Sequence, residues 1–350
     1  MNGKARMQQD DSRYPQGGGS GSDGDGANRK YGNETDFVLA VDFGGTKIAM
    51  STATTNGVRL IETEIPTHAP QGATRVMERM FDAAHALIAQ TTARHGGALR
   101  VVAAVTPGIV EPDGVRLAPN NPGWDTLPLA QTLRAGFDGA SVVVETDVKA
   151  AALAESRCGA LMGVECGLYL NLGTGLASAA VIDGKVLRGA HGAAGEIGYQ
   201  LRGVADEIPF ADGGTPLEQF VSGSALSNRV GALLGRSVSA REAFVLAGAD
   251  ARIAALIDDA LYRLAVHIAN IALTLDPSRI AVGGGMARVP RILPELAAML
   301  ARAVPYPPEV VPAAFEHGAA LQGAILCAVD AWTAAQRVQS PEWVRAATAV

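Results

Sequence analysis

Two segments of the chain share a pattern of glycine and threonine that suits phosphate binding. In each, a β-prone run ends at a turn that holds two glycines and a threonine, and a second apolar run follows. Asn56-Gly57 and Asp183-Gly184 then mark a further hairpin in each segment. Glycines at such turns leave backbone N–H groups uncovered, and clustered N–H groups can hold phosphate oxygens. The residues concerned are Asp42, Gly44, Gly45, Thr46 and Lys47 in the first turn and Gly173, Thr174 and Gly175 in the second.

Side chains at these turns add to the chemistry of the backbone. The two threonines supply hydroxyl donors, and Lys47 supplies a positive charge. Asp42 stands where a carboxylate can hold a hydrated magnesium ion. Two tight turns in ordinary sheets are the alternative interpretation, but the recurrence of one pattern favours a nucleotide phosphate site.

Asp147 is the candidate catalytic base. It follows the apolar run SVVVE and precedes an alanine-rich helix, so it lies at a strand-to-helix junction. Asp is also a preferred N-cap residue, and taken alone this position needs no other explanation. Beside two phosphate-binding turns, a carboxylate that accepts a hydroxyl proton during phosphoryl transfer is the better interpretation.

Three further polar residues are candidates for holding a substrate. Glu196 lies among glycines that let the backbone approach a ligand closely. Glu218 starts a helix, where the helix dipole alone would explain an acidic side chain. Asn120 can bind a hydroxyl or shape a Pro-Asn turn.

A glycine triplet follows the predicted strand RIAV and precedes a helical run that begins near Met286. Only small residues at such a junction allow an adenosine to lie on the backbone, although a helix–sheet packing turn would look the same. The triplet consists of Gly283, Gly284 and Gly285. The chain contains neither a P-loop nor a protein-kinase catalytic loop.

Length and composition indicate an α/β protein. A chain of 350 residues, 48% of them hydrophobic, is long enough for two domains. The net charge of −6 opposes a nucleic-acid partner, and no apolar run is long enough to cross a bilayer. Cys158, Cys166 and Cys327 show neither metal-ligand spacing nor an even disulfide set, which favours reduced thiols in a cytoplasmic protein.

The polar residues over 1–36 lack apolar periodicity and predict a disordered tail, and 336–350 is predicted to be a second tail. The segment from Gly19 to Gly24 matches a dinucleotide fingerprint, but it follows no strand and opens no helix. We therefore give it no function. No signal peptide is recognised before the fold, which again predicts a cytoplasmic location.

Six motifs, in one order, resemble those of the ROK family of sugar kinases and sugar-responsive repressors. They are Asp42-Phe-Gly-Gly-Thr-Lys47, Asp147 before the alanine-rich helix, Thr174 between two glycines, Gly195-Glu-Ile-Gly198, Leu217-Glu218 before SGSAL, and Gly283-Gly-Gly285. The resemblance spans 37–335 and implies a two-domain actin-like ATPase (ribonuclease H-like) fold with a cleft between the domains. An N-terminal α/β domain over 37–146 would be completed by a helix over 318–335, and 147–317 would form a C-terminal α/β domain.

The resemblance also implies roles for these residues. Both turns would hold the phosphates of ATP with Mg²⁺, the glycine triplet would border the adenosine, and Asp147 would take the proton from an exocyclic primary hydroxyl. Domain closure would exclude water. A homo-oligomer with a small sugar or cyclitol substrate, and without nucleic-acid or membrane partners, is expected. Ring hydroxyls would be held at Gly108, Asn120, Glu196 and Glu218, with Thr146 and Tyr199 at two further sugar-contact positions.

Departures from the family pattern bear on metal and substrate. Tyr199 occupies the position of a zinc-binding His that also contacts the sugar, and 201–214 contains no cysteine, so no structural zinc is expected. Thr146 replaces an Asn that contacts the sugar, and Lys149 replaces an Asn near the base. A site built to pair particular hydroxyls rejects analogues that lack them, so these exchanges predict an altered substrate.

The sequence therefore predicts an ATP-dependent kinase for a glucose-like substrate other than glucose, such as an amino sugar or a C7-cyclitol (carbasugar). An ordinary glucokinase that uses ATP or polyphosphate is the alternative. A transcriptional repressor would need an N-terminal winged helix, for which the tail is too short and too polar. Asp147 and both turns together oppose a sugar-binding protein without catalysis.

Overall fold

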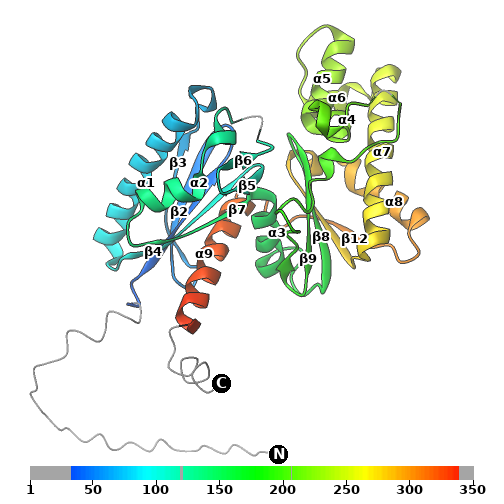
Figure 1. Ribbon diagram of the computed structural model, residues 1–350. Coiled ribbons are helices and arrows are strands. Elements are labelled where there is room, and N and C mark those ends of the chain that lie inside the picture. Colours follow the sequence, from blue (N-terminus) through cyan, green and yellow to red (C-terminus); the bar gives the residue numbers. More distant parts are fainter. Residues whose placement is uncertain (1–32, 119–120, 206, 339–350) are drawn as a thin grey trace, which may run out of the picture. The chain divides into compact units, whose positions relative to one another are not determined.

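The computed structural model describes residues 33–118, 121–205 and 207–338. Its first sheet has five strands in the order β3-β2-β1-β4-β7 (Figure 1). β1 runs antiparallel to β2 and parallel to β4, which in turn runs parallel to β7. The strands are β1 (Phe37–Phe43), β2 (Lys47–Thr54), β3 (Arg59–Pro66), β4 (Leu99–Thr106) and β7 (Ser141–Thr146).

The central strand of this sheet is buried on both faces. Leu39 and Val41 belong to the core that includes residues of α1 (Ala73–His95), and Val38 and Ala40 belong to the core that includes residues of α9 (Ala319–Val338). All four side chains are fully buried. A strand covered by helices on both faces reads as a continuous apolar run, as the segment FVLAV does.

A second five-stranded sheet has the order β10-β9-β8-β11-β12. β8 pairs antiparallel with β9 and parallel with β11, so it repeats the pairing of β1. The predicted hairpins are confirmed, including the Asp183-Gly184 turn, where both residues have positive φ. The strands are β8 (Cys166–Leu172), β9 (Leu176–Ile182), β10 (Lys185–Val186), β11 (Arg279–Gly283) and β12 (Glu309–Pro312).

The long helix α7 (Ala251–Leu275) shows how the sequence positions the helices of this part. Ile253, Ile257, Leu264 and Ile268 recur at helical spacing and are buried in the core beside the second sheet. The side chain of Asp250 caps the helix by accepting the N–H of Arg252 at 2.9 Å. The neighbouring helices are α4 (Glu218–Val221), α5 (Gly223–Leu234), α6 (Ala240–Leu246) and α8 (Ile292–Ala303). The helix α3 (Asp147–Cys158) packs instead against α9, β8 and β9.

The helical run predicted to begin near Met286 is only a 3-10 turn over Gly285–Arg288, and α8 starts later. Val289 is extended because it precedes Pro290, whose ring disfavours helical backbone in the preceding residue. The remaining elements are the small sheet of β5 (Ile109–Glu111) and β6 (Gly114–Arg116), and α2 (Leu129–Gly136).

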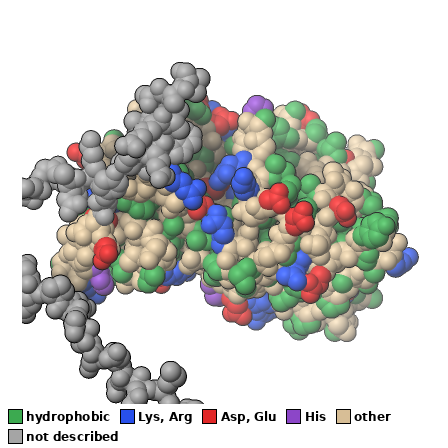
Figure 2. Space-filling model, turned by 90° about the horizontal axis from the view of Figure 1, so that it is seen from below, with side chains coloured by type: hydrophobic (Ala, Val, Ile, Leu, Met, Phe, Trp, Pro, Cys, Tyr) green, Lys and Arg blue, Asp and Glu red, His purple; other side chains and the backbone are tan. Residues whose placement is uncertain are grey.

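The surface and the chain ends need only brief description. Acidic and basic side chains are interspersed on the face that Figure 2 shows. In the described residues, no helix combines the length and the apolar character needed to cross a membrane. Most of the two predicted tails, 1–32 and 339–350, lies outside the described residues. Asp36, at the end of the first predicted tail, is buried and pairs with Arg100 at 2.7 Å.

Candidate active site

The C-terminal ends of three parallel strands in the first sheet bring candidate residues together. Asp42 on β1 lies opposite Val105 on β4, and Thr106 lies opposite Thr146 on β7. Asp147 follows directly as the first residue of α3. The two acids interact, because the charge of Asp147 raises the pKa of Asp42. The predicted magnesium ligand and the predicted base therefore lie in one electrostatic neighbourhood.

Asp42 is a half-buried carboxylate whose ionised form is disfavoured. Burial is the main cause and raises the pKa of Asp42 to about 7; the charge of Asp147 raises it as well, and the charge of Lys47 lowers it. A cation beside this carboxylate would favour its ionised form. The donor set suits Mg²⁺, which is commonly held by one or two carboxylates together with substrate phosphates.

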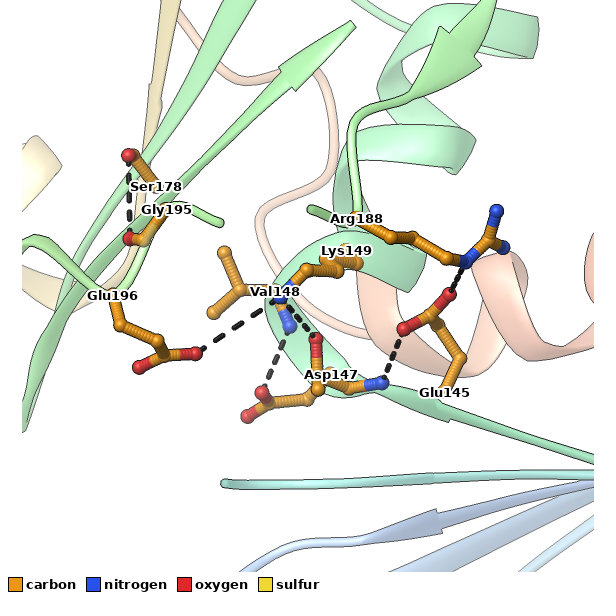
Figure 3. Close-up of polar contacts among 9 residues, drawn as sticks. Glu145, Asp147, Val148, Lys149, Ser178, Arg188, Gly195 and Glu196 are labelled. Carbon is orange, nitrogen blue, oxygen red and sulfur yellow. Dashed lines mark hydrogen bonds and ion pairs between the residues drawn. The ribbon is translucent and has the colours of Figure 1, made fainter. Parts of the chain in front are cut away.

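Asp147 is oriented by the start of its own helix. Its Oδ1 accepts the N–H of Val148 at 2.8 Å (Figure 3). Burial raises the pKa of Asp147, while the Val148 N–H and the charge of Lys149 lower it. Thr146 occupies the N-cap position without a side-chain capping bond. Asp147 is thus the first helical residue and not the N-cap, although its carboxylate accepts one N–H of the first turn.

Glu196 faces the first turn of α3. Its Oε1 lies 4.0 Å from Nζ of Lys149 (Figure 3). Burial raises the pKa of Glu196, Lys149 lowers it, and the charges of Asp147 and Glu218 raise it. The structure therefore brings Glu196 into the electrostatic neighbourhood of two acids that are far from it in the sequence.

Gly195 holds the Glu196 loop close to β9. Its carbonyl accepts the N–H of Ser178 at 2.8 Å. Its φ is 92°, and a Cβ at this position would lie 1.9 Å from the carbonyl oxygen of Ser178. Only glycine allows this approach, so the glycine-rich sequence fixes where Glu196 starts.

Glu218 joins the second glycine turn to α4. Its Oε2 accepts the N–H of Leu176 at 2.8 Å, at the first residue of β9. A Cβ on Gly175 would lie 2.7 Å from the same oxygen. The helix dipole is therefore not the only stabilising contact of this acid, as the sequence alone would have allowed.

Tyr199 lies at the end of a 3-10 turn over Ile197–Tyr199. Its ring meets the ring of Phe210 edge-on, with the centroids 5.4 Å apart. Burial and the charges of Glu218 and Glu196 raise the pKa of Tyr199 to about 12. The phenol therefore shares the neighbourhood of the two acids that were predicted to bind the substrate.

The second glycine turn docks on the start of α5. The carbonyl of Gly173 accepts the N–H of Gly223 at 2.9 Å, and that of Thr174 accepts the N–H of Ser224 at 3.3 Å. Gly284 passes beside this turn with a φ of 85°, and a Cβ there would lie 2.5 Å from the carbonyl oxygen of Leu172. The tertiary structure thus joins the second turn and the glycine triplet.

A pocket of about 910 Å³ opens at this junction. Its walls combine hydroxyl and amide groups from α5, an arginine and a phenylalanine from α6, and apolar side chains after β11. The residues that characterise it are Gly173, Thr174, Ser224, Asn228, Arg241, Phe244, Gly285, Met286 and Val289. Such a mixture of apolar walls and a few polar groups is typical of sites for small molecules.

The first glycine turn lies outside that pocket, since none of the wall residues in the described chain comes from the segment Asp42 to Lys47. A Cβ on Gly45 would meet nothing within 4 Å. Lys47 pairs with Glu64 on β3 at 2.5 Å, and both side chains are exposed. Among the described residues, the two glycine turns do not line the same pocket.

The other predicted contact positions have different surroundings. Asn120 lies outside the described residues. Gly108 has a φ of 90°, and a Cβ there would lie 2.3 Å from the carbonyl oxygen of Arg116. The buried hydroxyl of Thr146 accepts a hydrogen bond from Nζ of Lys149 at 3.4 Å.

Several site residues had no recognised signal in the sequence. Asn228, Arg241 and Phe244 form pocket walls, but they come from two helices and belong to no motif. Asn121, next to the predicted contact residue Asn120, is 5% exposed, and its side-chain amide has no hydrogen-bond partner among the described residues. It does not belong to the described wall residues of the pocket.

The segment after Tyr199 is held by polar and cation–π contacts. Both oxygens of Glu207 accept backbone N–H groups, from Arg202 at 2.7 Å and from Gly203 at 3.0 Å. The guanidinium of Arg202 lies 4.4 Å from the ring centre of Phe220. Across the residues that the structure describes, no cluster of three His, Cys, Asp or Glu side chains is arranged to hold a metal.

Known sugar kinases are similar to this chain in sequence. A glucokinase of Halalkalibacterium halodurans is 30% identical over 283 residues, which cover 72% of this chain and 81% of the relative. A kanosamine kinase of Amycolatopsis mediterranei is 29% identical and covers 84% and 96% of the two chains. An N-acetylmannosamine kinase of Escherichia coli is 33% identical and covers 83% and 98%.

Solved structures give the same grouping. A ROK hexokinase from Thermus thermophilus has a TM-score of 0.72 at 28% identity and covers 85% of this chain and 99% of its own. A ROK glucokinase from Streptomyces griseus, in complex with glucose and AMPPNP, has a TM-score of 0.64 at 28% identity and covers 84% and 99%. The model of the ROK family matches residues 38–331. The chain therefore belongs to the ROK family, has the actin-like ATPase fold of that family's sugar kinases, and is a phosphotransferase.

Proposed function

We propose that the protein is an ATP-dependent kinase for the exocyclic primary hydroxyl of a specialised glucose-like substrate, an amino sugar or a C7-cyclitol. The observation that carries the proposal is the carboxylate of Asp147. It is half-buried at the start of α3 and interacts electrostatically with Asp42 and Glu196. A base in this setting can accept a hydroxyl proton where the phosphate donor is bound.

In the proposed reaction, Asp147 accepts the proton of the substrate hydroxyl as its oxygen attacks the γ-phosphorus of ATP. A new P–O bond forms, the bond from the γ-phosphorus to the bridging oxygen breaks, and ADP leaves. The raised pKa of Asp147 makes it a better proton acceptor than an exposed aspartate. Asp42 would hold a hydrated Mg²⁺, which, when bound, neutralises charge on phosphate oxygens.

ATP is the proposed donor. The pocket of about 910 Å³ has apolar walls at Phe244, Met286 and Val289, which suit a nucleoside, whereas a polyphosphate offers them no apolar surface. The Streptomyces griseus relative binds the ATP analogue AMPPNP. In this proposal the second turn holds phosphates and the glycine triplet borders the adenosine.

The acceptor is proposed to differ from plain glucose because the contact set differs. Tyr199, Thr146 and Lys149 surround the proposed acids and replace side chains common in the family. Kanosamine kinase, a relative of this chain, shows that such proteins include kinases of specialised sugars. An ordinary glucokinase is the second candidate, since the Halalkalibacterium halodurans relative is a glucokinase.

Domain motion and assembly are also part of the proposal. The first sheet with α9 and the second sheet with its helices would form two domains that close on the substrate, so that ATP is not lost to hydrolysis. We further propose a cytoplasmic homo-oligomer. The proximity of Asp147 to Asp42, together with the two glycine turns, opposes a repressor or a non-catalytic sugar-binding protein.

An acceptor panel tests the function. Purified protein is incubated with ATP or polyphosphate, Mg²⁺ and one of several acceptors: glucose, mannose, kanosamine, N-acetylmannosamine or a C7-cyclitol. Phosphate esters are detected by mass, and kcat/KM is measured for each pair. We expect the highest kcat/KM with ATP and an acceptor other than glucose. The highest kcat/KM on glucose would establish the glucokinase alternative. Sugar binding without any product would overturn the proposal that the protein is a kinase.

A further inference from the structure

Lys149 is a buried lysine two residues after Asp147, and the proton and phosphoryl transfers proposed above do not use it. Only 2% of the residue is exposed. It lies in the first turn of α3, and its side chain reaches toward Glu196 (Figure 3). The ammonium is therefore placed among the same side chains as the proposed base and the proposed substrate ligands.

The hydrogen bonds of this ammonium are incomplete. A lysine has three N–H donors. Among the described residues, one of them reaches Thr146 Oγ1 at 3.4 Å, and Glu196 Oε1 lies 4.0 Å away, beyond hydrogen-bond distance. Buried charges are normally both paired and hydrogen-bonded, so donors of Lys149 remain available for a further oxygen.

A second buried charge on the same helix shows what full satisfaction looks like. Glu155 is 0% exposed. Its oxygens accept the backbone N–H groups of Ala160 at 2.7 Å, Phe315 at 3.0 Å and Ala314 at 3.1 Å. These hydrogen bonds join two loops to α3 and compensate for the burial of the Glu155 charge. Within the described part of the chain, Lys149 has no comparable set of hydrogen bonds.

The surroundings of Lys149 favour an oxygen acceptor over a cation. The ammonium lowers the pKa of both Glu196 and Asp147, so its field reaches the space between these acids. A hydroxyl or carbonyl oxygen placed there gains a charge-assisted hydrogen bond. A protonated amine at the same place would meet the like charge of Lys149 and, although the carboxylates of Asp147 and Glu196 would attract it, it has no lone pair to accept a hydrogen bond from Lys149.

We propose that Lys149 Nζ donates a hydrogen bond to a hydroxyl or carbonyl oxygen of the acceptor and so selects oxygen over an amine at one ring position. This inference rests on the proposed function and narrows its substrate class. The acceptor carries oxygen where it meets Lys149, as a cyclitol or an amino sugar aminated elsewhere does. Lys149 is then a specificity-determining contact, and Asp147 remains the base.

The test compares the wild type with Lys149→Met, which removes the ammonium and keeps a chain of similar length. The acceptors are glucose and its 2-amino, 3-amino and 4-amino analogues, assayed at a pH where the amines are protonated. We expect Lys149→Met to raise the KM for glucose about ten- to a hundredfold, as loss of a charged hydrogen bond predicts. The wild type should prefer hydroxyl over amine strongly at one ring position, and Lys149→Met should remove that preference at that position only.

Controls separate binding from folding. Removing one partner of a buried charge pair can destabilise a protein, so the melting temperature of Lys149→Met is measured first and every KM is determined well below it. Lys185→Met, at an exposed lysine on β10, is the matched control and should leave every KM within twofold of the wild type. Lys149→Arg keeps the charge and should retain part of the preference.

Two outcomes overturn the inference. One is a Lys149→Met protein that keeps the wild-type KM for glucose and all hydroxyl-to-amine ratios. The other is a Lys149→Met protein that binds the same sugars with wild-type affinity in calorimetry, which measures binding even without turnover. That result would show that Lys149 does not contact the sugar. Binding without product in the wild type would overturn the proposed function alone. If none of the four sugars binds, the comparison is repeated with the C7-cyclitol of the acceptor panel, and absence of binding there as well would overturn both.

Discussion

The two glycine turns share one sequence pattern but have different surroundings. The second turn is packed: its carbonyls bond to the start of α5, Gly284 lies against it, and its residues line a pocket of about 910 Å³. The first turn is also bonded, since Thr67 donates to the carbonyls of Gly44 and Thr46, but it is more open, with free space around Gly45 and an exposed pair between Lys47 and Glu64. The first turn has instead the half-buried carboxylate of Asp42 at its start.

This contrast shows that two copies of one motif can contribute different properties to a site. The packed turn contributes a fixed backbone conformation, because close backbone contacts hold it before a ligand binds. The open turn contributes negative charge, because Asp42 and Asp147 lie near each other at the C-terminal ends of the strands of the first sheet. We therefore expect substitutions at the charged end to reduce turnover and substitutions at the packed end to reduce stability.

The largest effect is expected at the charged end, for Asp147→Asn. An amide cannot accept the hydroxyl proton, so kcat should fall about 10²- to 10⁴-fold. Steady-state kinetics with the best acceptor from the panel measure the loss. Calorimetry should show acceptor affinity close to that of the wild type. A variant that keeps the wild-type kcat would show that Asp147 is not the base. It would also contradict the proposed contribution of charged residues near the first turn.

A matched pair of glycine substitutions tests the packed end. Gly284→Ala places a Cβ 2.5 Å from a carbonyl oxygen at positive φ, so we expect a loss of about 2–3 kcal/mol in the free energy of unfolding. Gly45→Ala meets open space and should change stability by less than about 0.5 kcal/mol. Chemical denaturation measures both. Equal effects of the two substitutions would show that the turns do not differ in packing.

Asp42→Asn should separate stability from activity. The amide removes a half-buried charge whose ionised form is disfavoured, so the free energy of unfolding should rise by about 1 kcal/mol near neutral pH. Activity should fall because the proposed magnesium ligand is lost. Thermal unfolding and kinetics on the same sample check the two directions. A variant both less stable and fully active would contradict the assignment.

The smallest effect concerns the pH dependence of Lys149→Met. The base works only when ionised, so kcat/KM falls as the pH drops through the pKa of Asp147. Lys149 lowers that pKa, and its removal should move the acid limb of the profile to higher pH. The titratable groups that interact with Asp147 are Asp42 on β1, Lys149 on α3, Tyr169 on β8 and Glu196 in its loop. A shift to lower pH would contradict the assignment of the base.

Local patterns predicted much of the fold. The hairpins at Asn56-Gly57 and Asp183-Gly184 are confirmed because turn glycines and alternating apolar runs act over a few residues. The prediction of a helix from near Met286 is wrong in its start, because Pro290 disfavours helical backbone at Val289 and the segment before it forms only a 3-10 turn. The roles of the predicted site residues remain predictions, and Asn120 lies outside the described residues.

The sequence by itself determined the two hairpins, the junction at Asp147 and the family, since each depends on residues close together in the chain or on motifs in a fixed order. Only the tertiary structure decided that Lys149 is buried beside Glu196, that Glu218 bonds to Leu176, and that Phe244 lines a pocket with Gly173. These contacts join residues tens of positions apart. Their geometry depends on how whole elements pack, which no local spacing encodes.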